Sequence, residues 1–265
     1  MTRAIKTPLA SVGKPFVIEF AGTPNVGKDT QIEILSDYLQ DYRGLRVSII
    51  GEVYRDSKII KDHIARLHWV LAKVIQNLSE LKDSSADVII VNRGLFDVLV
   101  FFNYYYRRGY MKKKEFRVIS SLITSGTLCD IEDLIIVMQT NAEVAIHREK
   151  VFPGNTIFNL SMTLDGWNPD PTPTITHQDG LVLLNKCYDE IIARFGNSFK
   201  RTYRIVDDGN KSIDDVALEV GSHLHSFLPQ TKDALHKATP SAENKSRNQE
   251  IQLSFPKISG DEDRA

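Results

Sequence analysis

The chain of 265 residues is 42% hydrophobic and 25% charged, a globular composition that excludes a fibre and a wholly disordered chain. Its 33 basic and 34 acidic residues leave a formal net charge of -1, so it lacks the positive field that would attract nucleic acid polymers or acidic membranes. The N-terminus has no signal-peptide core and no apolar run approaches the roughly 20 residues that span a bilayer, so we expect a cytoplasmic protein.

Short apolar runs rich in Val and Ile recur along the chain, and their length suits strands buried on both faces of a parallel sheet. Segments with helical spacing of apolar residues lie between them. The alternation of strand and helix, with right-handed crossovers, predicts a three-layer α/β fold in which helices flank a parallel five-stranded sheet. The expected strands are 16–20, 46–50, 87–91, 133–137 and 202–206, and the apolar stripes fall within 32–39, 60–78, 116–123 and 213–220.

The composition changes at three places and thereby suggests domain boundaries. Residues 1–13 form an N-terminal extension, and 14–228 form the folded domain. Within that domain, residues 152–180 are crowded with Pro, Gly, Asn and Thr, which is typical of a lid or an insertion. Residues 229–265 have few large apolar side chains, so we expect a disordered tail.

Two further features of the sequence have a structural interpretation. Cys129 and Cys187 stand alone, without the spacing of a zinc site, and are most simply small buried residues. The aromatic run "FFNYYY" at 101–106 could stack on a nucleobase, but its helical spacing favours packing in the core.

The stretch "AGTPNVGKDT" at 21–30 lies between an expected strand and an expected helix. This context raises Gly22-x-x-x-x-Gly27-Lys28 above a chance match to a phosphate-binding loop. Glycines let backbone N–H groups turn inward towards a phosphate, the helix N-terminus adds partial positive charge, and Lys28 reaches the outer phosphates. The predicted phosphate-binding residues are Gly22, Thr23, Pro24, Asn25, Val26, Gly27, Lys28, Asp29 and Thr30.

The loop carries Asp29 where such loops usually have a hydroxyl that binds Mg²⁺, and Thr30 follows it. A carboxylate is also a hard oxygen ligand, so Asp29 and Thr30 are candidate metal ligands. Alternatively, Asp29 only stabilises the first turn of the helix through the helix dipole.

The segment "FVIEFAGTPNVGKDTQIEILSDYL" resembles the opening of thymidylate kinases and related P-loop nucleoside and nucleotide kinases. The similarity continues at "VNRGLFD", "NAEVAIHREK" and "DDGNKSIDDVALEV", and covers roughly residues 14–225. The resemblance implies a kinase that binds ATP with Mg²⁺ and transfers a phosphoryl group to a nucleoside monophosphate or a nucleoside. It also brings a homodimer into consideration, because related kinases often form one.

The resemblance also implies roles for individual residues. Arg93 would contact phosphate or the acceptor, and Arg148 would be a lid arginine that stabilises the transferring phosphoryl group. Glu52 and Arg55 follow the second strand and are candidates for binding the acceptor, with Glu52 near the attacking hydroxyl. Asp97, five residues beyond Asn92, either holds Arg93 or begins a helix.

The sequence departs from the family pattern at two positions. Asn92 stands where the family usually has Asp, and Asp29 stands where it has Ser or Thr. One acidic oxygen donor is lost after the third strand and another is gained in the loop, so we hypothesise that the two changes are linked. Residues 152–180 also contain no Arg or Lys, which leaves charge neutralisation to Lys28, Arg93 and Arg148.

Two other functions stay open at this stage. A nucleotide-binding switch or NTPase would keep the loop and Lys28 but would need no acceptor pocket. A degenerate protein would bind nucleotide without turning it over, and the altered metal site keeps that option open.

Overall fold

The computed structural model describes residues 14–59, 62–82, 84–151, 178–224 and 227. The chain divides into a unit of Met1–Leu228 and a second unit of Pro229–Ala265, and the described residues all belong to the first. The predicted extension at 1–13, the tail at 229–265 and most of the predicted lid therefore lie outside the described residues. Within the described part, no helix has the length and apolar character needed to cross a membrane.

The described chain alternates strands and helices as the sequence predicts. The strands are β1 (Phe16–Gly22), β2 (Val47–Ile50), β3 (Val88–Asn92), β4 (Leu134–Thr140) and β5 (Thr202–Asp207). The α-helices are α1 (Lys28–Asp37), α2 (His63–Lys82), α3 (Leu95–Arg107), α4 (Lys113–Ile123), α5 (Gly126–Cys129), α6 (Ala142–Val151), α8 (Gln178–Phe195) and α9 (Ile213–Leu224). A π-helical turn η1 (Tyr38–Tyr42) and 3-10 turns η2 (Val53–Asp56) and η3 (Gly196–Ser198) complete the elements.

The five strands form one parallel sheet in the order β2-β3-β1-β4-β5. The central strand β1 pairs with β3 on one side and β4 on the other, so that Ile18 lies opposite both Ile90 and Leu134. The chain direction across the sheet therefore reverses at β1. In open parallel sheets, ligands bind at the carboxyl ends of the strands beside such a reversal.

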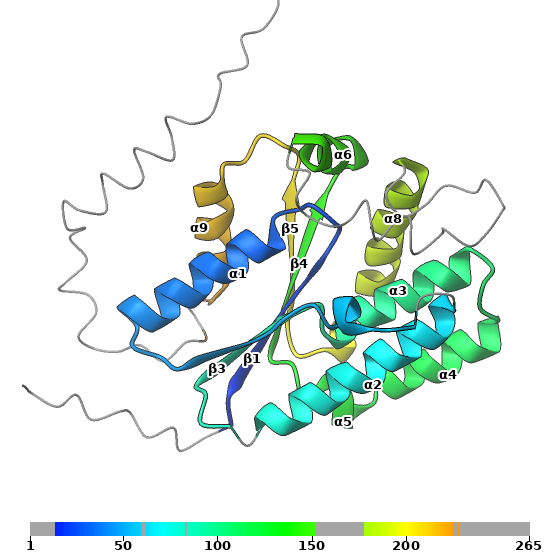
Figure 1. Cartoon of the computed structure of the whole chain (residues 1–265), viewed down its shortest axis with the longest axis horizontal. Coiled ribbons are helices and arrows are strands. Elements are labelled where there is room, and N and C mark those ends of the chain that lie inside the picture. Colours follow the sequence, from blue (N-terminus) through cyan, green and yellow to red (C-terminus); the bar gives the residue numbers. More distant parts are fainter. Residues whose placement is uncertain (1–13, 60–61, 83, 152–177, 225–226, 228–265) are drawn as a thin grey trace, which may run out of the picture. The chain divides into compact units, whose positions relative to one another are not determined.

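Helices cover both faces of the sheet, as Figure 1 shows. Helices α1 and α9 pack on one face against Ile18, Phe20 and other apolar side chains. Helices α2, α3, α4 and α8 pack on the other, in a larger core that contains the fully buried Phe96 and Phe102. These two apolar layers confirm the predicted three-layer α/β fold.

The two edge strands are less buried than the sequence predicts. Ile49 on β2 is 49% exposed and Val206 on β5 is 46% exposed, whereas β3 and β4 are buried throughout. An edge strand has a neighbour on one side only, and the helices cover the centre of the sheet first. Equal burial of all five runs was therefore a wrong expectation.

Some predicted boundaries and stripes also differ from the structure. Helix α8 begins at Gln178, so residues 178–180 are helical and do not belong to the irregular segment. Leu122 on α4 is 50% exposed and Tyr38 is 43% exposed, although both fit an apolar stripe in the sequence. Tyr38 follows the end of α1, and the spacing that placed it in the stripe does not say which neighbour covers it.

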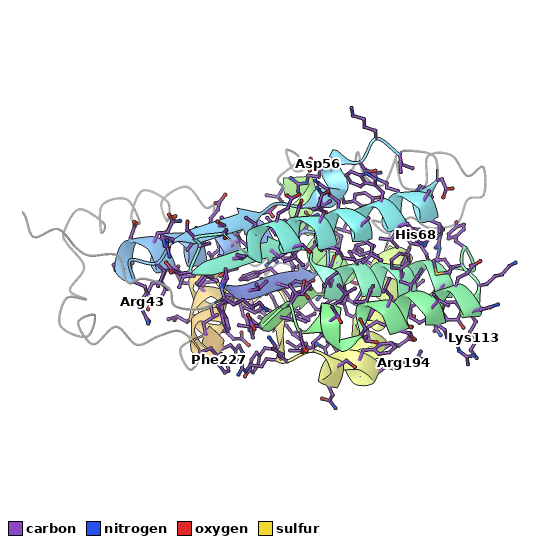
Figure 2. The ribbon with its side chains drawn as sticks, turned by 90° about the horizontal axis from the view of Figure 1, so that it is seen from below. Arg43, Asp56, His68, Lys113, Arg194 and Phe227 are labelled. Carbon is purple, nitrogen blue, oxygen red and sulfur yellow. The ribbon has the colours of Figure 1, made fainter. Side chains whose placement is uncertain are left out.

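The aromatic run belongs to the core, as its spacing favours. Phe102, Tyr104 and Tyr105 on α3 are buried, and Tyr106 stacks on Phe116 of α4 with ring centroids 5.2 Å apart. The two cysteines are free and buried, as the sequence predicts. Figure 2 shows α2 and α4 from below, with Lys113 at the start of α4 pointing away from the helices.

Candidate functional site

The phosphate loop joins β1 to α1 at the carboxyl edge of the sheet. Gly22 has φ +146, and a Cβ at this position would lie 2.0 Å from the carbonyl oxygen of Met138 on β4. The next residue is fixed to the same strand, because the Thr23 N–H donates to Met138 O at 3.1 Å. The loop ends at Gly27, whose left-handed φ of 93 places it as the N-cap of α1. Glycine is needed at both positions, for space at the first and for backbone conformation at the second.

Lys28 lies folded inside this loop. Its side chain is buried, and Nζ donates to the carbonyl oxygens of Gly22 at 3.2 Å and Thr23 at 2.9 Å. Burial and, after it, the charge of Arg93 lower the pKa of Lys28 to about 7, although the charges of Asp97, Glu52 and Asp29 act to raise it. A bound polyphosphate would favour the charged ammonium, because an opposite charge nearby stabilises the ionised form. The buried lysine is thus placed where a phosphate would stabilise its charge.

Arg93 adopts a strained backbone beside the loop. Its φ of 66 is left-handed, a conformation that costs a residue with a side chain about 1–3 kcal/mol. Nη1 donates to Gly22 O at 2.9 Å and to Asp97 Oδ2 at 2.8 Å, while Nε lies 3.0 Å from Glu52 Oε1. Burial alone would lower the pKa of Arg93, but the charges of Asp97 and Glu52 raise it, so the guanidinium stays charged.

Glu52 and Arg55 lie in the turn after β2, where Glu52 pairs with Arg93. Glu52 precedes η2, and Arg55 Nε donates to its Oε2 at 3.1 Å. Arg55 Nη2 also lies 3.7 Å from Asp29 Oδ2. Because Arg55 is half exposed, this pair adds little stability. The pair instead connects the turn after β2 to the first turn of α1.

Asp29 and Asn92, the two departures from the family pattern, are in direct contact. Asn92 Nδ2 donates to Asp29 Oδ1 at 2.6 Å, and Asn92 Oδ1 is buried without a hydrogen-bond partner. The proximity required by the hypothesis that the two changes are linked is therefore present. Thr30 is exposed on the same turn of α1, and its role as a metal ligand stays a prediction.

A magnesium ion fits these oxygen donors. Mg²⁺ is usually held by one or two carboxylates, waters and the phosphates of the substrate, and not by a cage made of protein alone. The described residues contain no cluster of three or more His, Cys, Asp or Glu that could hold a metal. The half-exposed carboxylate of Asp29 and the orphaned oxygen of Asn92 are hard ligands of the required kind.

Asp97 fulfils both of the alternatives that the sequence left open. It lies in the first turn of α3, and it also pairs with Arg93. The side chain is 1% exposed, and Oδ1 accepts the N–H of Gly22 at 3.0 Å. Both oxygens are thus occupied by groups of the protein. Any effect of Asp97 on the substrate passes through Arg93 or Gly22.

Arg148 lies on α6 and reaches the tip of the loop. Nη2 donates to Asp207 Oδ2 at 2.6 Å, and Nη1 lies 3.5 Å from Asn25 O. Asn25 in turn donates to Ala145 O of the same helix at 3.4 Å and has a left-handed φ of 57. The fold therefore brings Arg148 beside the phosphate loop, as the predicted role requires.

Two buried glutamates accept hydrogen bonds from the first turn of α3. Glu19 on β1 accepts the N–H groups of Phe96 and Asp97, and Glu132 accepts that of Leu95. Burial raises the pKa of both carboxyls, that of Glu132 to about 7, and the charge of Glu132 also raises the pKa of Glu19. Sequence reasoning missed both, although Glu19 is a lone acid within an apolar strand and could have drawn attention.

Gly94 explains how the two glutamates come so close to the helix. A Cβ at this position would lie 2.2 Å from Glu132 Oε1 and 2.7 Å from Glu19 Oε2. A residue larger than glycine would push the carboxyls away from the N–H groups that they cap. The pair thereby fixes the start of α3, and with it the positions of Arg93 and Asp97.

We expect Glu132→Gln to remove part of the dependence of stability on pH. A carboxyl whose pKa is raised in the folded state contributes stability that is complete below its unfolded value near 4.5 and is lost as the pH rises through about 7. One proton corresponds to at most about 1.4 kcal/mol per pH unit in this window. The free energy of unfolding measured in urea between pH 5 and pH 8 should therefore fall less for the variant than for the parent.

A matched control for this prediction is Glu33→Gln on the exposed side of α1, which should retain the pH dependence of the parent. The explanation fails if Glu132→Gln loses the same amount of stability as the parent on going from pH 5 to pH 8.

No family model matches the chain, and no curated protein matches its sequence. Solved structures match it in fold. A deoxyadenosine kinase from M. mycoides with the products dCMP and a flexible dCDP bound superposes with a TM-score of 0.56 at 17% identity, over 80% of this chain and 100% of that one. The same enzyme with dATP bound gives 0.55 at 16% identity, over 79% and 99% of the two chains.

Thymidylate kinase from Candida albicans also matches, with a TM-score of 0.52 at 14% identity over 80% of this chain and 92% of that one. At these identities the likeness concerns the fold. It agrees with the resemblance noted in the sequence. The chain shares the three-layer α/β fold of these deoxyadenosine and thymidylate kinase structures.

Proposed function

We propose that this protein is a P-loop kinase that transfers the γ-phosphoryl group of ATP to a nucleoside or a nucleoside monophosphate. The observation that carries the proposal is the position of Arg93, which donates to Gly22 O of the phosphate loop and also pairs with Glu52. A single buried guanidinium thus joins the donor side to a carboxylate on the acceptor side. A switch that only hydrolyses nucleotide has no use for this connection.

In this proposal the side chains act mainly by positioning and by charge stabilisation. The loop amides and Lys28 hold the triphosphate, and Arg148 lies beside the loop to stabilise charge on the transferring group. Arg55 and Arg93 orient the acceptor, and where the acceptor is a nucleoside, Glu52 takes the proton of its attacking hydroxyl. A guanidinium suits these tasks because its planar fork matches the oxygens of a phosphoryl group.

Magnesium, when bound with the nucleotide, would neutralise charge that develops on the phosphate oxygens. Asp29 would be its carboxylate ligand, and the unpartnered oxygen of Asn92 would hold it directly or through water. The contact between Asn92 and Asp29 fixes the rotamer of the carboxylate. Orientation of this kind is what residues behind a metal ligand usually provide.

The test of the proposed function is ADP release from MgATP, measured with and without a panel of nucleosides and nucleoside monophosphates. Stimulation by an acceptor supports the kinase and identifies its acceptor class. Turnover that is independent of every acceptor supports an NTPase or switch, and binding of MgATP without turnover supports a degenerate nucleotide-binding protein.

We expect the exchange of residues 29 and 92 to be compensatory. Asp29→Ser alone removes the carboxylate, and Asn92→Asp alone sets two carboxylates about as close as the present 2.6 Å contact, where they repel each other. Each single change should lower Mg²⁺-dependent turnover roughly 10-fold to 100-fold, as for other residues around a metal. The double variant should recover most of the parent rate.

Turnover measured over a Mg²⁺ titration compares the four proteins, and Glu33→Gln on α1 serves as the control for unrelated charge loss. A double variant slower than either single variant would show that a carboxylate at position 92 does not compensate for the loss of the carboxylate at position 29.

A further inference from the structure

Tyr188 links α8 to the phosphate loop through its hydroxyl. It is fully buried and is the largest side chain in the core with this degree of burial. The hydroxyl donates to Asp97 Oδ1 and accepts the N–H of Gly22 at 3.1 Å. A helix that lies more than 150 residues further along the chain therefore contacts the first glycine of the loop by a polar group.

Asp97 is the centre of this arrangement. Three donors from three elements reach it, namely Gly22 from the end of β1, Tyr188 from α8 and Arg93 from the turn after β3. Its own N–H donates to Glu19 Oε1 at 2.8 Å. A buried carboxylate is stable only when such donors satisfy it, so its position depends on all of them.

The Gly22 residue is held through both of its backbone polar groups. Its N–H faces Asp97 and Tyr188, and its carbonyl oxygen accepts from Lys28 and Arg93. The two cations of the proposed phosphate site are thus oriented by one carbonyl. The N–H lies in the Ala21–Gly22 peptide and the carbonyl in the Gly22–Thr23 peptide, so a shift of Gly22 would move the carbonyl and with it both cations.

We propose that Tyr188 is a positioning residue that holds Asp97 and, through it, Gly22, Arg93 and Lys28 in the arrangement that binds the outer phosphates of a nucleotide. Tyr188 is 0% exposed and cannot touch the nucleotide itself. This inference rests on the proposed function in one respect, because it takes the loop to bind a nucleoside triphosphate.

A simple packing role for Tyr188 makes different predictions. Phenylalanine keeps the ring and fills the same space, so packing alone predicts that Tyr188→Phe binds nucleotide as the parent does. The neighbouring Cys187 provides the converse control, since it is also fully buried on α8 and Cys187→Ala removes volume without removing this polar link. The two variants separate the hydroxyl from the packing.

The experiment is a calorimetric titration with MgATP, and the affinity for AMP is measured by its competition with MgATP. We expect Tyr188→Phe to weaken MgATP about 10-fold, the usual effect of losing a hydrogen bond to a charged group, and to leave AMP nearly unchanged. The ratio of the two affinities is the decisive quantity, because general loosening of the fold would lower both. Cys187→Ala should retain the parent ratio.

A double-variant cycle tests whether Tyr188 acts through Asp97. In an Asp97→Asn background, Tyr188→Phe should change MgATP affinity by less than about 2-fold, since contacting residues are not additive. Asp97→Asn also keeps the size of its side chain. If Tyr188→Phe does not fold, Asp97→Asn gives a second measurement, in which the ratio of MgATP affinity to AMP affinity should fall.

The proposal is overturned if folded Tyr188→Phe binds MgATP with the affinity of the parent, or if its affinities for MgATP and AMP fall by the same factor. It is also overturned if Tyr188→Phe lowers MgATP affinity as much in the Asp97→Asn background as in the parent. The binding measurements on Tyr188→Phe and the kinase assay can fail independently of each other. A parent protein that binds MgATP but phosphorylates no acceptor would refute the proposed function and leave this measurement intact. A parent that binds no MgATP would refute both.

Discussion

Lys28→Met should lower acceptor-dependent turnover by about 10²–10³-fold, the usual effect of removing one donor that stabilises developing charge. The physical reason is the position of Nζ, which donates hydrogen bonds to the carbonyl oxygens of Gly22 and Thr23 at the start of the phosphate loop. Methionine fills the buried space but carries no charge. Steady-state ADP release at saturating acceptor and a calorimetric titration with MgATP provide the two measurements.

The control is Lys113→Met on α4, where the lysine is exposed and points away from the helices (Figure 2). This variant should retain the turnover and the affinity of the parent. A Lys28→Met protein that binds and turns over MgATP normally would mean that the loop does not grip the triphosphate, and the proposed site would then be wrong.

Gly22→Ala should destabilise the fold by more than about 4 kcal/mol or displace the loop, which is an exceptional effect for one methyl group. A Cβ at this position would lie 2.0 Å from Met138 O and 2.8 Å from its carbonyl carbon. These are backbone atoms of a fully buried strand, so neither neighbour can move aside by changing a rotamer. Urea unfolding of the variant and its affinity for MgATP measure the two outcomes.

Gly27→Ala is the matched control within the same loop. Gly27 also has a positive φ, of 93, but a Cβ there would meet nothing within 4 Å. Its cost is therefore the left-handed conformation alone, about 1–2 kcal/mol. If Gly22→Ala proves no more costly than Gly27→Ala, then space beside β4 does not constrain the loop.

The strand and loop positions were predictable because they depend on local chemistry. The apolar run at 16–20 and the glycine spacing that follows it specify a buried strand and a turn around a phosphate, and β1 and the loop lie where this pattern places them. The proximity of Asn92 and Asp29 was predictable only in part. Asn92 ends β3 and Asp29 follows β1, and the carboxyl ends of parallel strands meet at one edge, but only the structure shows that these two strands are neighbours.

The burial of individual side chains was less predictable. Leu122 and Tyr38 have the spacing of buried residues but are exposed, because spacing defines a helix face and does not say which neighbour covers it. Ile49 has the composition of a buried strand but lies on an edge of the sheet. The order of the strands decides this, and no local pattern carries that order.

By itself, the sequence determined the alternation of strands and helices, the glycine-lysine loop and the candidate cations, since these depend on residues close together in the chain. Only the tertiary structure decided that Asp97 faces inward and that Tyr188 and Glu132 support the site. A buried carboxyl or hydroxyl takes its role from the donors and acceptors that surround it. Those partners come from distant segments, and folding alone brings them within hydrogen-bonding distance.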